Sequence, residues 1–250
     1  MYRRICTALW ACLLATGPVF AVETIVLQSG FDEQNSVSWS PGQLDVGLTY
    51  LTTGTSASSF GSAFSAADFL AAQGGKTAYA IAPLVQNNFQ IYAPSLFAPY
   101  PLAQWVNTGP TALTPYTTLY AMPFQVTTAN ISSASLSMKW AVDDSLGDAT
   151  SSGPNPVGVY LNGTAVPAAI SGGDLKLLTT AFDPNIGPLL QTGQNWLYVY
   201  DRELGGPGAA GVMFGATITV VPEPSGAALA GLGMLAVAAF VRRRRQTGRS

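Results

Sequence analysis

Three aspartates between residues 143 and 148 have a type and spacing that could do chemistry in this chain of 250 residues. Asp143, Asp144 and Asp148, with Asn155 in the same Gly- and Pro-containing stretch, offer oxygen ligands of the kind that Ca²⁺ prefers. Their spacing differs from that of an EF-hand loop, and acids in such a stretch also cap turns and face solvent. The sequence favours turn capping and leaves a Ca²⁺ site as the open alternative.

Paired carboxylates suggest a second kind of chemistry. Two acids that face each other across a cleft, about 5 to 10 Å apart, can hydrolyse a glycosidic bond. No sequence pattern here indicates such a cleft. A secreted glycoside hydrolase is therefore the least favoured of the functions considered.

An aromatic stripe is the other chemically suggestive feature. Trp196, Tyr198 and Tyr200 alternate along one predicted strand and therefore share a face of it. On an exposed face they would form a platform for the apolar faces of sugar rings, with Leu197 and Val199 turned to the core. With the faces exchanged they would be large core residues, which the sequence favours. Exposed rings would indicate a carbohydrate-binding module, and buried rings a surface protein without a glycan site.

The residue types that are missing exclude much other chemistry. Histidine is absent, and both cysteines, Cys6 and Cys12, belong to the first dozen residues. The remaining chain therefore cannot build a Ser-His-Asp triad, a cysteine nucleophile, a zinc site of His and Cys, or a disulfide. Residues 22–221 hold four basic and twelve acidic residues, a net charge of −8. Such a field disfavours binding to nucleic acid phosphates.

The elements that must position these residues are predicted to be β-strands. Short apolar runs are separated every ten residues or so by turn-forming residues, a pattern typical of an all-β fold. The strongest strand is 136–142, whose alternation places Leu136, Met138, Trp140 and Val142 on one face. One face is therefore buried, as in an antiparallel sandwich.

Two more strands and a helix follow from similar patterns. Residues 157–161 form an apolar run that ends at Asn162-Gly163, a pair favoured in tight hairpin turns. Residues 211–221 alternate again and lead directly into the C-terminal tail. One short helix is predicted over 65–74, because a serine opens that segment and a glycine closes it.

Together these elements predict an antiparallel β-sandwich, with residues 22–220 as one extracytoplasmic domain. Residues 22–74 either belong to the sandwich or form a less ordered elaboration, because 52–62 is a Ser/Thr/Gly tract with little to bury. The stretch 120–219 resembles the jelly-roll of galactose-binding-like domains, on runs such as Trp140-Ala141-Val142-Asp143-Asp144. That fold carries sugar binding, adhesion and mere spacing alike, so the resemblance does not decide the function.

Residues 1–21 have the organisation of an export signal. Arg3 and Arg4 precede a short apolar stretch, and Val19 and Ala21 stand where a signal peptidase reads small residues. As a helix, the apolar stretch spans only about 16 Å, roughly half of the hydrocarbon core of a membrane. We therefore expect a cleavable signal helix rather than an anchor, with cleavage between Ala21 and Val22.

Residues 221–250 have the organisation of a membrane tail. Val221-Pro222-Glu223-Pro224 is followed by an uncharged stretch, 225–241, which reaches about 26 Å as a helix and can span a membrane. A stop-transfer cluster then follows, formed by Arg242, Arg243, Arg244 and Arg245. The positive-inside rule keeps these arginines in the cytoplasm and everything before Val221 on the far side.

In this order, the Pro222-Glu223-Pro224 motif, the short Gly/Ala/Leu-rich helix and the terminal Arg run resemble the PEP-CTERM sorting signal of Gram-negative bacteria. The resemblance implies that an exosortase reads the motif at the inner membrane and removes the tail. It also implies a bacterium that makes exopolysaccharide, and a product at the cell surface or in the extracellular matrix. An ordinary anchor that is never cut is the alternative.

The sequence as a whole therefore predicts an exported, non-enzymatic surface or exopolysaccharide-matrix protein with a structural or adhesive role. Its processing partners would be signal peptidase and an exosortase, its contact with the inner membrane would be transient, and no cofactor beyond the candidate Ca²⁺ is expected. A carbohydrate-binding module for exopolysaccharide is the first alternative, and a glycoside hydrolase the second.

Overall fold

The computed structural model describes residues 21–32, 36–53, 59–82, 85–86, 89–90, 97–149, 153–175, 178–205 and 210–223. The predicted signal helix up to residue 20, Pro224, the predicted helix 225–241 and Arg242 to Arg245 lie outside the described residues. Within the described ranges, no helix has the length and apolar character needed to cross a membrane.

Strands make up most of the regular structure, with one α-helix and one short 3₁₀ helix among the described residues. The strands are β1 (Glu23–Gln28), β2 (Phe31–Asp32), β3 (Val37–Ser38), β4 (Leu44–Thr52), β5 (Lys76–Ile81), β6 (Val85–Gln86), β7 (Phe89–Gln90), β8 (Trp105–Asn107), β9 (Thr118–Val126), β10 (Ile131–Val142), β11 (Ser145–Leu146), β12 (Val159–Leu161), β13 (Thr164–Ala165), β14 (Thr179–Asp183), β15 (Gly193–Arg202) and β16 (Val212–Pro222). The helices are α2 (Ala66–Gln73) and η2 (Gly187–Leu189).

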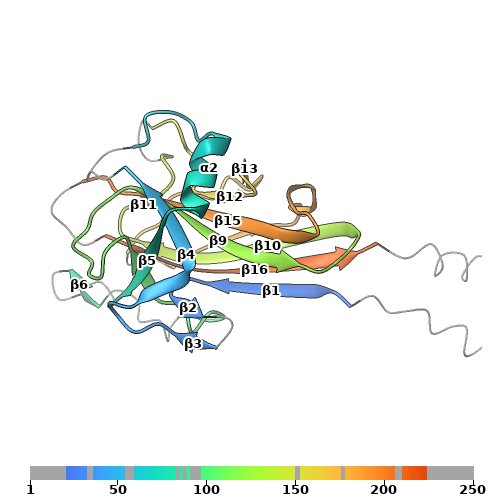
Figure 1. The fold of residues 1–250 in the computed structure, drawn as a ribbon, viewed down its shortest axis with the longest axis horizontal. Helices are drawn as coiled ribbons and strands as arrows, with labels where there is room; N and C mark the ends of the chain where they lie inside the picture. The colour runs from blue at the N-terminus through green and yellow to red at the C-terminus, as the bar shows by residue number, and fades with distance from the viewer. Residues whose placement is uncertain are drawn as a thin grey trace, which may run out of the picture.

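Ten strands follow one another in a single curled sheet, in the order β13-β12-β15-β9-β4-β5-β8-β16-β10-β14. Strand β1 adds to β16, and β11 adds to β15. The described strand pairs are antiparallel. The curl brings the β15–β9 part of the sheet over the β10–β16 part (Figure 1). The prediction of a mainly antiparallel β fold with one α-helix is thus confirmed for the described residues.

The core lies between these two parts of the curled sheet. Strands β10 and β16 pair along nearly their whole length, with Leu136 opposite Ile218. The predicted alternation is confirmed: the residues turned into the core are Leu136, Met138, Trp140 and Val142 on β10, and Val212, Phe214, Ala216, Ile218 and Val220 on β16. Leu197 and Val199 of β15 meet them from the other side. Burial of this many large side chains supplies the main driving force for folding.

The predicted hairpin and helix are also confirmed. Asn162 (φ 49°) and Gly163 (φ 82°) join β12 to β13 in the left-handed conformation that a tight two-residue turn requires. Helix α2 begins after Ser65, whose side chain and that of Asp68 form a capping box, and ends at Gly74.

Much of the segment 22–74 belongs to the main sheet rather than to a less ordered elaboration. Strand β1 pairs with β16, and β4 pairs with both β5 and β9. Leu27 and Leu48 are fully buried in the core. The sequence did not indicate this arrangement, because the composition of the Ser/Thr/Gly tract favours a less ordered segment and the strands around it pair with partners far away in the sequence. Residues 54–58 of that tract lie outside the described ranges.

Candidate functional site

The aromatic stripe of β15 lies on the outer face of the sheet but is largely covered. Leu197 and Val199 face the core, as expected if the stripe is on the opposite side. Tyr198 and Tyr200 are nevertheless only 1% and 0% exposed, whereas Trp196 is partly exposed. The stripe therefore faces outward, as predicted for a sugar-binding platform, but two of its three rings are buried, as predicted for core residues.

A second aromatic layer covers the stripe. Phe69 of α2 packs on Tyr198 with the ring planes tilted by 59° and the ring centroids 4.7 Å apart, and Phe64 meets Tyr200 edge-to-face at 5.0 Å. Phe60 also meets Tyr200, at 5.7 Å. Offset and edge-to-face geometries of this kind are the favoured arrangements of aromatic pairs. Phe60 and Phe64 were missed because the segment 59–64 has no periodic pattern. Phe69 lies in the predicted helix, but its packing on the stripe is a long-range contact that the sequence did not indicate.

Trp196 and Tyr198 line a pocket at the border of this layer, which we call the α2–β15 pocket. Its volume is about 670 Å³. The described lining residues are Phe64, Ala66, Phe69, Leu70, Gln73, Asn162, Gly163, Gln191, Gln194, Trp196 and Tyr198. None of these carries a formal charge, so the lining offers aromatic faces and carboxamide groups.

Hydrogen bonds hold the polar groups of the pocket in place. The Asn162 Oδ1 atom accepts from the Trp196 backbone N–H at 2.9 Å, and the Gln73 Nε2 donates to the Tyr198 hydroxyl at 2.5 Å. Gln191 Nε2 donates to the backbone carbonyl of Gln194 at 2.9 Å. The pocket wall is thus built by the Asn162 turn, the last turn of α2 and the start of β15, and it is largely preformed.

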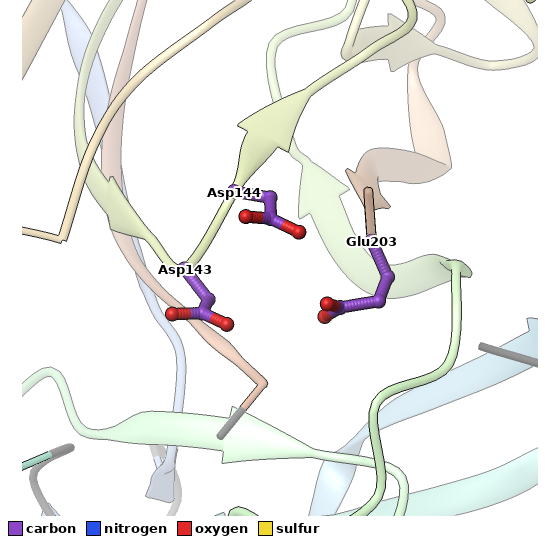
Figure 2. A group of neighbouring side chains, drawn as sticks. All are labelled: Asp143, Asp144 and Glu203. Carbon is purple, nitrogen blue, oxygen red and sulfur yellow. The ribbon is translucent and has the colours of Figure 1, made fainter. Parts of the chain in front are cut away.

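The described chain also brings three acidic side chains together, which we call the carboxylate cluster. Asp143 and Asp144 follow β10, and Glu203 follows β15. One carboxylate oxygen from each lies within 4.8 Å of the other two. Figure 2 shows that all three side chains point into a common space from these two chain segments.

The carboxylate cluster is strongly perturbed electrostatically. Burial, and then the neighbouring charge of Asp144, raise the pKa of Asp143 to about 7. Burial, together with a hydrogen bond to the Asp144 carboxyl group, raises the pKa of Glu203 to about 8. The Leu204 backbone N–H donates to Asp144 Oδ2 at 2.5 Å. Asp143 and Glu203 therefore resist ionisation beside their acidic neighbours.

Asp201 adds a fourth acidic group behind the carboxylate cluster. It lies in β15 on the same face as Leu197 and Val199, two residues before Glu203. The residue is only 5% exposed. Burial raises its pKa well above the ordinary value, and the charges of Glu203, Asp143 and Asp144 raise it further.

Asp148 does not join Asp143 and Asp144, so the three predicted ligands do not form one site. Its carboxylate forms an ion pair with Arg202, whose Nε lies 3.0 Å away, and accepts hydrogen bonds from the Tyr200 hydroxyl at 3.1 Å and the Asn155 backbone N–H at 3.0 Å. It is also buried, not exposed in a solvated turn. The reason is strand β11, which pairs with the end of β15 and carries the chain beyond it to the Tyr200 side.

Glu203 and Asp201 were missed as companions of Asp143. The Asp201-Arg202-Glu203 sequence does place two acids on one face next to a predicted strand. That β15 ends beside the end of β10 depends on long-range packing, which a single sequence does not show.

The residues of the predicted processing sites lie at one end of the sheet. Val22 precedes β1, and Glu23 pairs with Val220 of β16. Pro222 is the last residue of β16 and lies opposite Ile131, while the Glu223 N–H donates to the Asn130 carbonyl at 2.9 Å. The described chain thus begins and ends side by side.

Comparison with known proteins adds little. No protein-family model matches the chain, and no curated protein does. One similar solved structure is the isomalto-dextranase of Arthrobacter globiformis T6 complexed with panose, with 10% sequence identity and a TM-score of 0.27. The alignment covers 80% of this chain and 32% of that protein, so this chain spans about a third of its length. A similarity this low supports no statement about function.

Proposed function

We propose that this chain is an exported, non-enzymatic surface or matrix protein of a Gram-negative bacterium, and that it adheres to neutral carbohydrate through the α2–β15 pocket. The observation that carries the glycan part is the pocket itself, whose lining includes the partly exposed Trp196, Tyr198 and the carboxamide side chains of Asn and Gln residues. The curled antiparallel sheet is compatible with a galactose-binding-like jelly-roll, which we propose as its fold family.

The chemistry of the pocket suits a sugar ring. One face of a pyranose is apolar and packs on an aromatic ring, while its hydroxyls need partners that both donate and accept. Gln73, Gln191 and Gln194 supply such carboxamides around Trp196. Because the described lining holds no carboxylate, the pocket is suited to binding and not to acid-catalysed hydrolysis.

The proposed sorting rests on the tail motif and is supported by the position of the chain ends. If a signal peptidase cuts before Val22 and an exosortase acts at Pro222-Glu223-Pro224, both sites lie at the end of the sheet where β1 begins and β16 ends. That end would face the inner membrane before release. The 12 residues of β10 then place Asp143 roughly 40 Å farther from it.

The glycan proposal is tested by affinity electrophoresis of the purified protein in gels that contain dextran, galactomannan or the exopolysaccharide of the host. We expect at least one neutral polysaccharide to retard the protein. Trp196→Ala should weaken the interaction by about ten-fold or more, because a central aromatic contact of this kind commonly carries much of the binding energy. Trp196→Phe should retain part of it.

A matched control is Phe182→Ala, which removes an exposed aromatic side chain from β14, at the other end of the sheet order. It should leave retardation unchanged. The proposal is wrong if none of the three polysaccharides retards the protein, or if Trp196→Ala is retarded as strongly as the native chain while its melting temperature is unchanged.

The sorting proposal is tested by the intact mass and the subcellular fraction of the protein from its native host, with and without the exosortase. A product that begins at Val22 and ends near Pro222 to Pro224, outside the inner membrane, is expected only when the exosortase is present. A full-length tail with Arg242 to Arg245 retained in the inner membrane of both strains would show that the tail is an ordinary anchor.

A further inference from the structure

We propose that the turn between β9 and β10, residues 127–130, is a clasp that holds the sorting motif in the sheet, and that its release sets the rate at which the tail is cut. This inference rests on the proposed sorting and adds the regulation of that site. The clasp contacts both ends of the described chain, at the end of the sheet where β1 begins and β16 ends (Figure 1).

The first part of the motif belongs to the folded sheet. Pro222 closes β16 opposite Ile131, and the Glu223 N–H donates to the Asn130 carbonyl at 2.9 Å. An enzyme that cuts a peptide bond needs the chain around that bond in its own cleft, so residues paired in a sheet must first come free. Glu223 is exposed, so its backbone hydrogen bond, and not burial, is what restricts access.

Only the end of β16 has to open. Strand β1 accompanies β16 as far as Val220, which lies opposite Glu23, and beyond this pair β10 is the one described strand that pairs with β16. The register between β10 and β16 also shifts here, between Ile131 and Ser133. A short segment with one neighbour and an irregular ladder opens more readily than the middle of a sheet. The contacts of the clasp therefore decide how often the motif is free.

The clasp is itself fastened by the other end of the chain. The Glu23 carboxylate accepts from the backbone N–H and the hydroxyl of Thr127, at 2.8 and 2.9 Å, and from the same two groups of Thr128, at 2.9 and 2.7 Å. Hydrogen bonds to an ionised carboxylate are stronger than those between neutral groups. The Thr192 hydroxyl also donates to the Thr128 carbonyl, at 2.7 Å. These bonds fix the backbone that carries the Asn130 carbonyl.

Glu23 thus links the two expected processing sites. It is the second residue after the expected signal cleavage between Ala21 and Val22, and its carboxylate holds the turn to which Glu223 is bonded. The main hydrophobic core contains no residue of the clasp. Loss of the clasp contacts therefore frees the end of β16 while the core of the sheet stays folded.

The test follows tail removal by pulse-chase labelling in the native host, with and without the exosortase. Thr127→Val and Thr128→Val each remove one hydroxyl donor to Glu23, keep the shape of the side chain and leave the signal cleavage site as it is. The double variant should lose its tail about five-fold faster than the native chain, because the opened state is more populated.

The matched control is Val212→Ala, which creates a cavity in the core at the opposite end of β16. It should lower the melting temperature without changing the rate of tail removal, because it leaves the clasp intact. Faster tail removal in this control, to the extent seen in the double variant, would show that general destabilisation is the cause and would overturn the proposal.

Hydrogen exchange of the full-length protein in detergent measures the clasp without the exosortase. The Glu223 amide should exchange about five-fold faster in the double variant, whereas the Ile218 amide, in the middle of β16, should exchange as in the native chain. Unchanged exchange at Glu223, or faster exchange with tail removal at the native rate, overturns the clasp but leaves the sorting proposal standing. A native tail retained in both strains overturns the sorting proposal and, with it, this inference.

Discussion

Two groups of acids, the buried Asp148 and the partly buried carboxylate cluster, lie at the same end of β15 but on opposite faces of the strand. Asp148 forms an ion pair with the Arg202 guanidinium at 3.0 Å and accepts two hydrogen bonds from other groups. The cluster formed by Asp143, Asp144 and Glu203 meets mainly other acids. Arg202 therefore compensates the charge of Asp148. The carboxylate cluster begins only a few residues earlier in the sequence, but it lies on the other face of β15 and is surrounded mainly by acids.

The difference shows how a charge-poor chain manages its few ionic groups. Residues 22–221 hold only four basic residues. The one on β15, Arg202, pairs with Asp148 on the outer face of the sheet. Because strand residues alternate between faces, Arg202 cannot reach the acids on either side of it in sequence. Repulsion among the acids of the inner face is therefore relieved in part by protonation, as the raised pKa values of Asp143 and Glu203 indicate.

The largest effect on the free energy of unfolding is expected from breaking the ion pair between Arg202 and Asp148. Arg202→Met leaves the buried Asp148 carboxylate without its cation, which should lower the free energy of unfolding by about 3–5 kcal/mol. Lys139→Met is the matched control, because Lys139 is partly exposed and contacts the Ala98 carbonyl; we expect a change of less than about 1 kcal/mol. Urea denaturation measures the free energy of unfolding of both variants. Equal decreases would contradict the prediction that Arg202 stabilises the protein by compensating the buried Asp148.

The strand pattern and the helix could be predicted from the sequence, because they depend on local chemistry. Leu136 to Val142 alternate on a period of two, and the capping box of Ser65 and Asp68 is a local signal. Asn162-Gly163 likewise needs only its own backbone preferences. Each of these predictions is confirmed.

The sites were harder to predict, because they depend on which distant segments meet. The Trp196 stripe was found, but Phe64 and Phe69 cover it from more than 120 residues away in sequence. Asp148 was grouped with Asp143 by proximity in sequence, whereas β11 leads it to a different partner. Alternation indicates the face of a side chain, but it does not indicate what covers that face.

An intermediate effect on the free energy of unfolding is expected from the titration of Asp45. This buried acid accepts hydrogen bonds but has no basic partner among its described contacts. Its carboxylate accepts from the N–H groups of Gly30 and Gly47, at 2.8 and 3.1 Å. Burial nevertheless raises its pKa from 3.8 to about 6. A raised folded-state pKa means that the folded chain binds the proton more tightly than the unfolded chain does. The stabilisation is therefore complete below about pH 4 and is lost as the pH rises through about 6.

The size of the Asp45 effect follows from the shift in its pKa. We expect this residue to contribute a decrease of about 2–3 kcal/mol in the free energy of unfolding between pH 4 and pH 7. Urea denaturation across this range, with Asp45→Asn as the comparison, isolates the contribution, because the variant lacks the titrating group. If the free energies of unfolding of the native chain and the variant depend on pH in the same way, the pKa of Asp45 is not raised by folding.

The smallest effect, and the one with an unusual sign, is expected from Glu203→Gln in the presence of a chelator at pH 9. Removing one negative charge from the carboxylate cluster relieves repulsion there, so the variant should be more stable than the native chain by about 1 kcal/mol, or about 2–4 °C in melting temperature. Asp148→Asn under the same conditions should be less stable, because it leaves Arg202 without its anion. Two conservative acid-to-amide changes at one end of one strand should therefore act in opposite directions. If both destabilise the protein, the cluster is compensated within the chain after all.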